Sequence, residues 1–175
     1  ITALSKVTGD FERAVQESSK ILSIRGRVVP STLQKVTITA EYMDGTKTIG
    51  ESKILCSGAK IRKVSLSPAD VTPANEAIGA IQEADIVILG PGSLYTSIIP
   101  NLLVKKITDA IAASGAVKIY VCNVMSQPEE THNFKASDHL QTLFSHAKKN
   151  IADYCVVNTA KIPDHMLERY RVEDK

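Results

Sequence analysis

The sequence lacks several features that would place it outside the cytoplasm. Its three cysteines, Cys56, Cys122 and Cys155, lie far apart and form no Cys-x-x-Cys pair, so neither a disulfide framework nor a zinc ribbon is indicated. No stretch approaches the roughly 20 apolar residues that a membrane-spanning helix requires. No basic-then-apolar signal segment opens the chain. We therefore expect reduced, mostly buried thiols in a cytoplasmic protein.

A surplus of charge of one sign is also missing. The 175 residues include 21 basic and 19 acidic ones, giving a formal net charge of +2, and the two signs are mixed along the chain. This balance creates no overall field that would favour nucleic acid or an anionic membrane. With 43% hydrophobic residues, the length suits one well-packed core. We expect residues 1–175 to form a single domain.

The usual motifs of nucleophilic and nucleotide-dependent catalysis do not occur. There is no Gly-x-Ser-x-Gly elbow, Walker lysine, Gly-x-Gly-x-x-Gly fingerprint or Cys-His pair. His139 and His146 are seven residues apart on a predicted helix, a rise of about 10 Å, whereas helical zinc ligands are commonly four apart. We expect no metal site. The sequence offers no evidence of nucleophilic catalysis.

What the sequence does contain is a regular alternation of predicted strands and helices. An amphipathic helix is predicted from residue 11, with Asp10 as its N-cap. Residues 36–49 alternate around an Asp44-Gly45 turn, which predicts a β-hairpin. Further strands are predicted at 60–66, 85–89, 117–123 and 154–157, and helices at 74–83, 97–113 and 137–148. This order predicts an α/β fold with a mainly parallel sheet covered by helices, to which the hairpin is an addition.

The most informative local segment is residues 84–104, ADIVILGPGSLYTSIIPNLLV. Its run of Ile and Val predicts a strand covered on both faces, and Gly90 and Gly92 permit close approach of the backbone to a ligand. Hydroxyls and free amides then meet the start of a helix, where phosphate or carboxylate is favoured; the hydroxyls belong to Ser93, Thr96 and Ser97. The simpler alternative is that the glycines only turn a strand into a helix.

Ligands of open parallel sheets bind beyond the carboxyl ends of the strands. The last three predicted strands each end in a polar segment, at residues 90–97, 123–138 and 158–164, and these converge if the strands are neighbours. Their amides and hydroxyls suit a base or a sugar; the candidates are Asn123, Gln127, Thr131 and Asn158. Glu129 and Glu130 would point to opposite sides of an extended backbone, so we expect two solvated carboxylates.

A third candidate element lies near the C-terminus. Tyr170 stands between Arg169 and Arg171, so its ring could stack on a base while a guanidinium meets a phosphate. An ordinary amphipathic helix with exposed arginines is the alternative.

Several long runs together resemble the gluconeogenesis-factor branch of the CofD-like family. They are GPGSLYTSIIPNLLV, YVCNVMSQPEETHNFKASDHL, and GDFERAV with SIRGRVVPST. The resemblance implies a Rossmann-like fold in a cytoplasmic bacterial protein that binds a nucleotide sugar such as UDP-N-acetylglucosamine. It also implies regulation of central carbon metabolism, cell-wall synthesis and cell shape, and it adds Tyr95 to the candidate ligand contacts. The enzymatic branch transfers 2-phospho-L-lactate from a guanylyl-activated donor to a deazaflavin, with a divalent metal.

The chain departs from the family pattern in three ways. The usual Gly-Gly-Gly-Thr-Gly opening and Asp-Asp-Gly-Gly-Ser segment are missing, and the chain starts at Ile1 and stops at Lys175. We therefore expect a fragment without the N-terminal glycine-rich βα unit and without the C-terminal end. Where the branch has Gln-Pro-Gly-Glu-Thr, this chain has Gln-Pro-Glu-Glu-Thr at residues 127–131.

The leading hypothesis is a nucleotide-sugar-binding regulator with no turnover of its own and no assigned cofactor or metal. We expect it to be a homo-oligomer, with the hairpin at 36–49 as a candidate subunit contact, without a nucleic-acid partner and without a membrane span. The alternative is a 2-phospho-L-lactate transferase-like enzyme. Its magnesium would have only Glu129 and Glu130 as local ligands.

Overall fold

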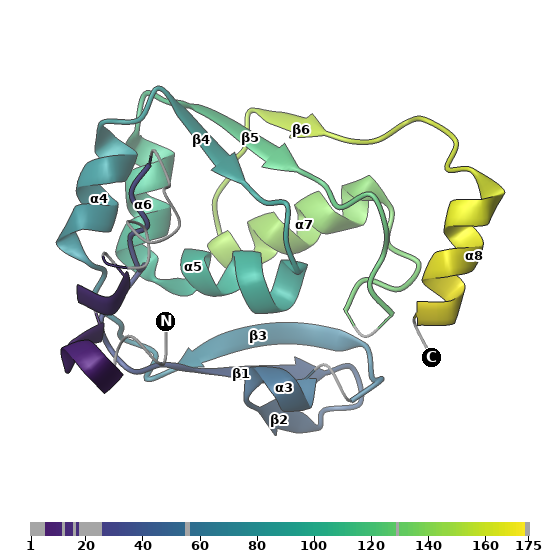
Figure 1. The fold of residues 1–175 in the computed structure, drawn as a ribbon, viewed down its shortest axis with the longest axis horizontal. Coiled ribbons are helices and arrows are strands. Elements are labelled where there is room, and N and C mark those ends of the chain that lie inside the picture. The colour runs from purple at the N-terminus through teal and green to yellow at the C-terminus, as the bar shows by residue number, and fades with distance from the viewer. Residues whose placement is uncertain are drawn as a thin grey trace.

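The computed structural model describes residues 6–11, 13–15, 17, 26–54, 57–128 and 130–173, the last four by their backbone alone. Its strands form two sheets of three strands each (Figure 1). One sheet is antiparallel, in the order β2-β1-β3, and the other is parallel, in the order β4-β5-β6. The predicted α/β class, with a parallel sheet and an antiparallel hairpin, is confirmed.

The antiparallel sheet begins with the predicted hairpin. Strands β1 (Thr37–Tyr42) and β2 (Lys47–Ile49) pair with Thr39 opposite Ile49. The carboxylate of Asp44 accepts the Thr46 N–H at 2.9 Å, and Gly45 takes a positive φ of 84°, which explains the Asp-Gly turn. The short helix α3 (Glu51–Ile54) follows. Strand β3 (Ile61–Ser67) pairs with the other edge of β1, so the added unit is larger than a hairpin.

The parallel sheet consists of β4 (Ile86–Leu89), β5 (Val117–Val121) and β6 (Tyr154–Val156), with β5 in the centre. Leu89 pairs with Tyr120, and Val121 pairs with Val156. The three carboxyl ends therefore lie along one edge of the sheet. The adjacency on which the predicted crevice depends is present.

The predicted helix at 97–113 is wrong as a single element. The chain instead forms a π-helical turn, η1 (Leu94–Ile98), then α5 (Ile99–Leu103) and α6 (Lys105–Ala113). Pro100 has no N–H to donate to the preceding turn, and Val104 is extended, with ψ of 92°. The helices predicted at 74–83 and 137–148 appear as α4 (Asn75–Gln82) and α7 (Ala136–Ala147), and the C-terminal segment that held a helix as its alternative reading forms α8 (Asp164–Glu173).

Helices α5 and α7 lie between the two sheets (Figure 1). The core is continuous from Val64 of β3, through Ile99 of α5 and Leu143 of α7, to Tyr120 of β5, each of which is at most 1% exposed. Burial of such side chains contributes roughly 1.5–3 kcal/mol each. The two sheets are therefore held together through the helices rather than by contact with each other.

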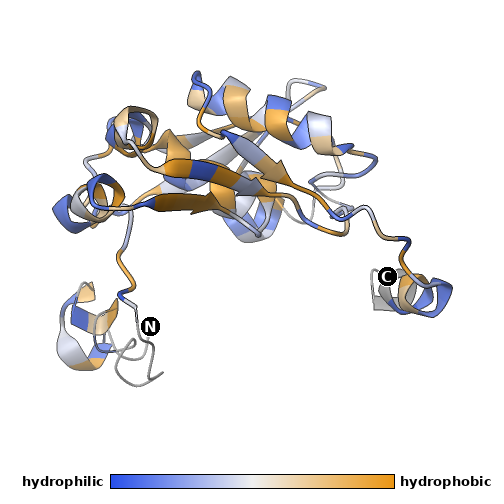
Figure 2. Ribbon diagram, turned by 90° about the horizontal axis from the view of Figure 1, so that it is seen from above, coloured by the Kyte–Doolittle hydropathy of each residue, from blue (hydrophilic) through white to orange (hydrophobic). Residues whose placement is uncertain are grey.

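The opposite face of the parallel sheet carries no helix among the described residues, and Figure 2 shows its apolar strands uncovered. Ile88 is 61% exposed and Tyr154 is 65% exposed. The prediction that strand 85–89 is covered on both faces is therefore wrong for the part of the chain described. The strands lie side by side in their sequence order, β4-β5-β6. Because parallel crossovers are right-handed, this order places all the connecting helices on the same face of the sheet.

Features near the N-terminus and the cysteines are described only in part. Asp10 Oδ1 accepts the Arg13 N–H at 2.8 Å, which confirms the predicted N-cap, but residues 18–25 of that helix lie outside the described ranges, as does Cys56. Cys122 and Cys155 are free thiols, and burial raises the pKa of both. No helix in the described ranges has both the length and the apolar character needed to cross a bilayer.

Candidate ligand-binding site

The turn after β4 brings the chain close to the end of β5. Gly90 has a φ of 90°, and a Cβ built there would lie 2.8 Å from the Val121 carbonyl oxygen. A side chain is excluded both by the left-handed backbone and by this contact. Contacts within the protein are therefore enough to explain why position 90 is glycine, and no ligand is needed to explain it.

Gly92 has a different environment. Its φ is not positive, and an added Cβ would make only ordinary contacts, 3.5 Å from Ser97 Cβ and 3.7 Å from Ile98 Cγ1. Its N–H donates to Asn123 Oδ1 at 3.1 Å, and its carbonyl accepts from Asn123 Nδ2 at 2.9 Å. Asn123 therefore clamps the turn after β4 from the end of β5. The described structure contains no steric reason for glycine at position 92.

Gln127 continues the clamp. Its Nε2 donates to Ser93 Oγ at 2.9 Å, and its backbone N–H donates to Thr131 Oγ1 at 2.9 Å. Thr131 is fully buried, and Gln127 Oε1 is buried without a hydrogen-bond partner among the described residues. Because Ser93 Oγ accepts from Gln127, its own proton remains available to another acceptor.

Glu130 reaches from the same loop to the start of η1. Glu130 is only 4% exposed. Its Oε2 accepts the Tyr95 N–H at 2.8 Å, and its Oε1 accepts the Thr96 hydroxyl proton at 2.6 Å. The expectation of a solvated carboxylate at Glu130 is wrong. The Tyr95 N–H is bound to Glu130 and the Gly92 N–H is bound to Asn123, so neither amide is free as predicted. Glu129 lies outside the described residues.

Tyr95 and Thr96 are buried, at 3% and 6% exposure. The Tyr95 hydroxyl donates to the Ile61 carbonyl at 3.4 Å, and its ring meets those of Phe134 and His146 edge-on, with centroids 6.5 and 5.8 Å apart. Burial raises the pKa of Tyr95. These side chains anchor the turn to the core, and their direct contact with a ligand stays a prediction. Ser97 is exposed, with its N–H bound to the Ser93 carbonyl at 2.9 Å.

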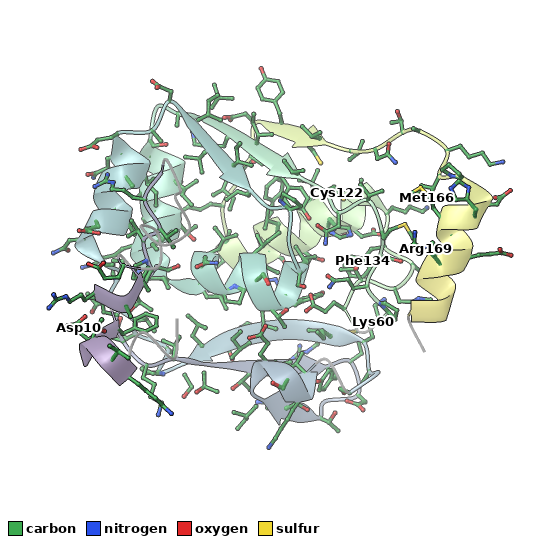
Figure 3. All side chains as sticks on the ribbon, in the orientation of Figure 1. Asp10, Lys60, Cys122, Phe134, Met166 and Arg169 are labelled. Atoms are coloured by element: carbon green, nitrogen blue, oxygen red, sulfur yellow. The ribbon has the colours of Figure 1, made fainter. Side chains whose placement is uncertain are left out.

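The third strand end contributes less. Asn158 is exposed, and its amide bonds locally to the backbone of Ala160. Helix α8 stands away from the body of the molecule in both Figure 1 and Figure 2. Figure 3 labels Arg169 and Met166 on this helix; Arg169 is exposed, and the side chain of Tyr170 lies outside the described part. Ligand roles for these residues remain predictions.

The two helix α7 histidines are engaged with neighbours in the protein. His139 Nδ1 lies 3.0 Å from the Tyr120 hydroxyl. His146 Nε2 accepts the Val64 N–H at 3.1 Å, and its Nδ1 lies 2.8 Å from the Thr142 carbonyl. Burial lowers the pKa of both histidines. Within the described ranges, no three His, Cys, Asp or Glu side chains are grouped to hold a metal ion.

Sequence reasoning thus named Asn123, Gln127 and the turn residues correctly as neighbours but missed the partner that ties them together. No local sequence pattern indicates that Glu130 caps the start of η1, because Glu130 lies 34 residues from Thr96, whose hydroxyl donates to it. The spacing of the Asn, Gln, Glu and Thr side chains along one loop was the only available hint.

Comparison with known proteins decides the family. The family model described as 2-phospho-L-lactate transferase CofD matches residues 1–175. The chain belongs to the CofD family. The gluconeogenesis factor of Bacillus subtilis (strain 168) is 44% identical over 173 residues, covering 99% of this chain and 55% of that protein. A putative gluconeogenesis factor of Thermotoga maritima is 45% identical over 174 residues, covering 99% and 54%.

A solved structure agrees with this assignment. The crystal structure of a UPF0052 family member from Bacillus halodurans has a TM-score of 0.91 and 44% identity, covering 98% of this chain and 55% of that one. The resemblance inferred from the sequence, to the gluconeogenesis-factor branch of the CofD-like family, is confirmed. The chain spans about half the length of the relatives it matches.

Proposed function

We propose that this chain forms the ligand-binding core of a gluconeogenesis factor, a cytoplasmic regulator that binds a nucleotide sugar of the UDP-N-acetylglucosamine class without turnover. One observation carries the proposal. Gly92 has no internal steric need to be glycine, yet it lies at the carboxyl end of β4, where open parallel sheets bind ligands. The names of the bacterial relatives support the regulatory role.

The proposed roles follow from the contacts at the turn. The diphosphate approaches Gly92, where no Cβ intervenes, and accepts the remaining proton of Ser93. Asn123 and Gln127 hold that turn through their amides, and Glu130 holds the start of η1. Arg169 supplies positive charge from α8, which suits a phosphate. The sugar or base lies along the polar loop after β5.

The test is isothermal titration calorimetry with UDP-N-acetylglucosamine. Ser93→Ala is expected to weaken binding about tenfold, since a hydrogen bond to a charged group contributes roughly 1.5–3 kcal/mol. Gly92→Ala is also expected to weaken binding, because its added Cβ would stand where the diphosphate approaches. Ser114→Ala is the matched control, because among the described residues its hydroxyl bonds only to the Ile111 carbonyl, at the amino-terminal side of β5. Unchanged affinity in both site variants would remove this turn from the ligand site.

A transferase is the second candidate, favoured by the description of the matching family. It would require a divalent metal, but both carboxylate oxygens of Glu130 already accept hydrogen bonds from the protein. The described residues therefore do not fit the expected magnesium site. Incubation with a deazaflavin acceptor, guanylyl-activated phospholactate and magnesium should yield no product. Product formation would overturn the non-catalytic part of the proposal.

A further inference from the structure

The face of the parallel sheet that no described helix covers (the bare face) is apolar along all three strands. Successive side chains of a strand alternate between faces, and those of paired residues share one. Ile86 pairs with Val117, and Ile88 pairs with Ile119. Ile86 and Ile88 are 54% and 61% exposed, so both pairs lie on the bare face. Strands β5 and β6 add further side chains to it: Val121, Tyr154 and Val156. Apart from the tyrosine hydroxyl, none of these side chains is polar.

The antiparallel sheet shows how this protein builds a sheet face that is not buried in its core. On the side of β1 and β3 turned away from the core, Thr39 lies opposite Ser65 and Glu41 lies opposite Lys63. Antiparallel sheets with one solvated face alternate in this way, whereas parallel sheets covered on both faces are apolar on both. The composition of the bare face is therefore that of a sheet face covered by other elements.

Strand β4 also has an unpaired edge beside the bare face. It is the first strand in the order β4-β5-β6 and pairs with no described strand other than β5. Natural edge strands are commonly protected from further pairing by a lysine, a proline or a bulge. Residues 86–89 are Ile-Val-Ile-Leu, and their register with β5 is regular. The edge of β4 is therefore suited to accept a further strand.

The handedness of parallel crossovers decides what can cover the bare face. The progression from β4 to β5 to β6 places the crossover helices on the side of α5 and α7 (Figure 1). Parallel strands added beyond β4, and progressing away from it, would place their right-handed crossovers on the opposite side. Because parallel strands are joined by such crossovers, usually helices, one βα unit would supply both a strand for the edge and a helix for the bare face.

We propose that the bare face and the edge of β4 form the docking surface for a βα unit of the same polypeptide, outside residues 1–175. The relatives have room for such a unit, because this chain covers 55% of the Bacillus subtilis gluconeogenesis factor and 55% of the UPF0052 structure. A second copy of the chain fits less well. A two-fold contact between two β4 edges leaves both bare faces uncovered, and a contact between two bare faces leaves both edges unpaired.

The docked unit has a consequence for the ligand site, and this consequence rests on the proposed function. The strand order would reverse at β4, and ligands of open parallel sheets bind at such a reversal. Gly92 lies at the carboxyl end of β4, so the docked unit would form the second wall of that site. The docking surface itself is argued without reference to a ligand.

Thiol labelling of the full-length gene product with a maleimide tests the docking proposal. Ile88→Cys lies on the bare face and Ile49→Cys on the antiparallel sheet, and the two native side chains have nearly equal exposure, 61% and 62%. In the native full-length protein, Ile88→Cys is expected to react at least about tenfold more slowly than Ile49→Cys, because labelling would require the docked unit to open. The two should react at similar rates in urea. Peptide mass spectrometry distinguishes these positions from the native cysteines.

Three results would overturn the proposal. The first is native labelling of Ile88→Cys as fast as that of Ile49→Cys, and the second is a gene that encodes no residues beyond these 175. The third is protection of Ile88→Cys that disappears on dilution by about a hundredfold, since a second copy would then cover the face. Thermal melting of both variants verifies the fold. The labelling contains no nucleotide sugar, so its failure is distinct from failure of the calorimetric test of ligand binding.

Discussion

At the scale of single residues, Gly90 and Gly92 lie in the same turn but in different structural environments. Gly90 is required by its left-handed backbone and by the Val121 carbonyl beside it, whereas Gly92 meets neither constraint. Glycine at position 90 is thus required for folding, whereas glycine at position 92 is the one that we propose serves ligand binding. The pair also supplies matched substitutions, since both replace glycine with alanine in the same turn.

We expect Gly90→Ala to lower the free energy of unfolding by about 2 kcal/mol or more, because alanine pays for the positive φ and meets a backbone oxygen at 2.8 Å. Gly92→Ala should change it by less than about 1 kcal/mol. Urea denaturation followed by circular dichroism measures both. Equal decreases in the free energy of unfolding would show that both glycines are required for stability, which would contradict this prediction.

At the scale of elements, helix α7 is joined to strand β3 through one imidazole ring. His146 accepts the Val64 N–H with Nε2, which leaves Nδ1 to donate to the Thr142 carbonyl, and only the neutral ring can do both. Burial lowers the pKa of His146; the hydrogen bond to the Thr142 carbonyl opposes this shift, and the nearby charge of Lys63 adds to it. Burial likewise lowers the pKa of His139, on the same helix.

The free energy of unfolding is therefore expected to be nearly independent of these histidines above about pH 7 and to fall as the pH drops below about 6.5, their ordinary pKa. Below that pH the unfolded chain binds protons that the folded protein does not, so the slope approaches about 1.4 kcal/mol per pH unit for each histidine. Urea denaturation over this range should show a shallower slope for His146→Gln. An identical slope in the variant would exclude His146 as a source of the dependence.

At the scale of the whole molecule, the prominent surface feature is the face of the parallel sheet that no helix of the described residues covers. Its exposed apolar side chains come from all three strands: Ile86, Ile88, Val117, Tyr154 and Val156. A contiguous apolar patch of this kind marks a surface that associates with another one or promotes aggregation. The hairpin named from the sequence as a subunit contact presents Ile49, which is also 62% exposed.

We expect the 175-residue chain to self-associate through the open sheet face, so Ile88→Lys should shift it toward monomer in size-exclusion chromatography with light scattering. Ile49→Lys is the control, because the two side chains have nearly equal exposure, 61% and 62%, and surface substitutions usually change stability by less than about 0.5 kcal/mol. If Ile49→Lys alone produces monomer, the hairpin is the contact instead.

The sequence by itself determined the features that local pattern encodes. Apolar runs between turn residues predicted all three parallel strands, the hairpin and most helices, because burial of one face leaves a periodic trace. The same local information located the turn after β4 and the loop that clamps it. It also carried the family resemblance, since that depends only on ordered residues.

Tertiary structure alone decided how distant segments meet. The Glu130 cap on Tyr95 and Thr96 joins residues 34 and 35 positions apart, and such a pair leaves no period in the sequence. The pairing of β3 with β1 rather than with the parallel sheet, and the bare face of that sheet, depend on strand order and crossover handedness. Which donors are free for a ligand follows from these contacts, because a hydrogen bond satisfied inside the protein is not available outside it.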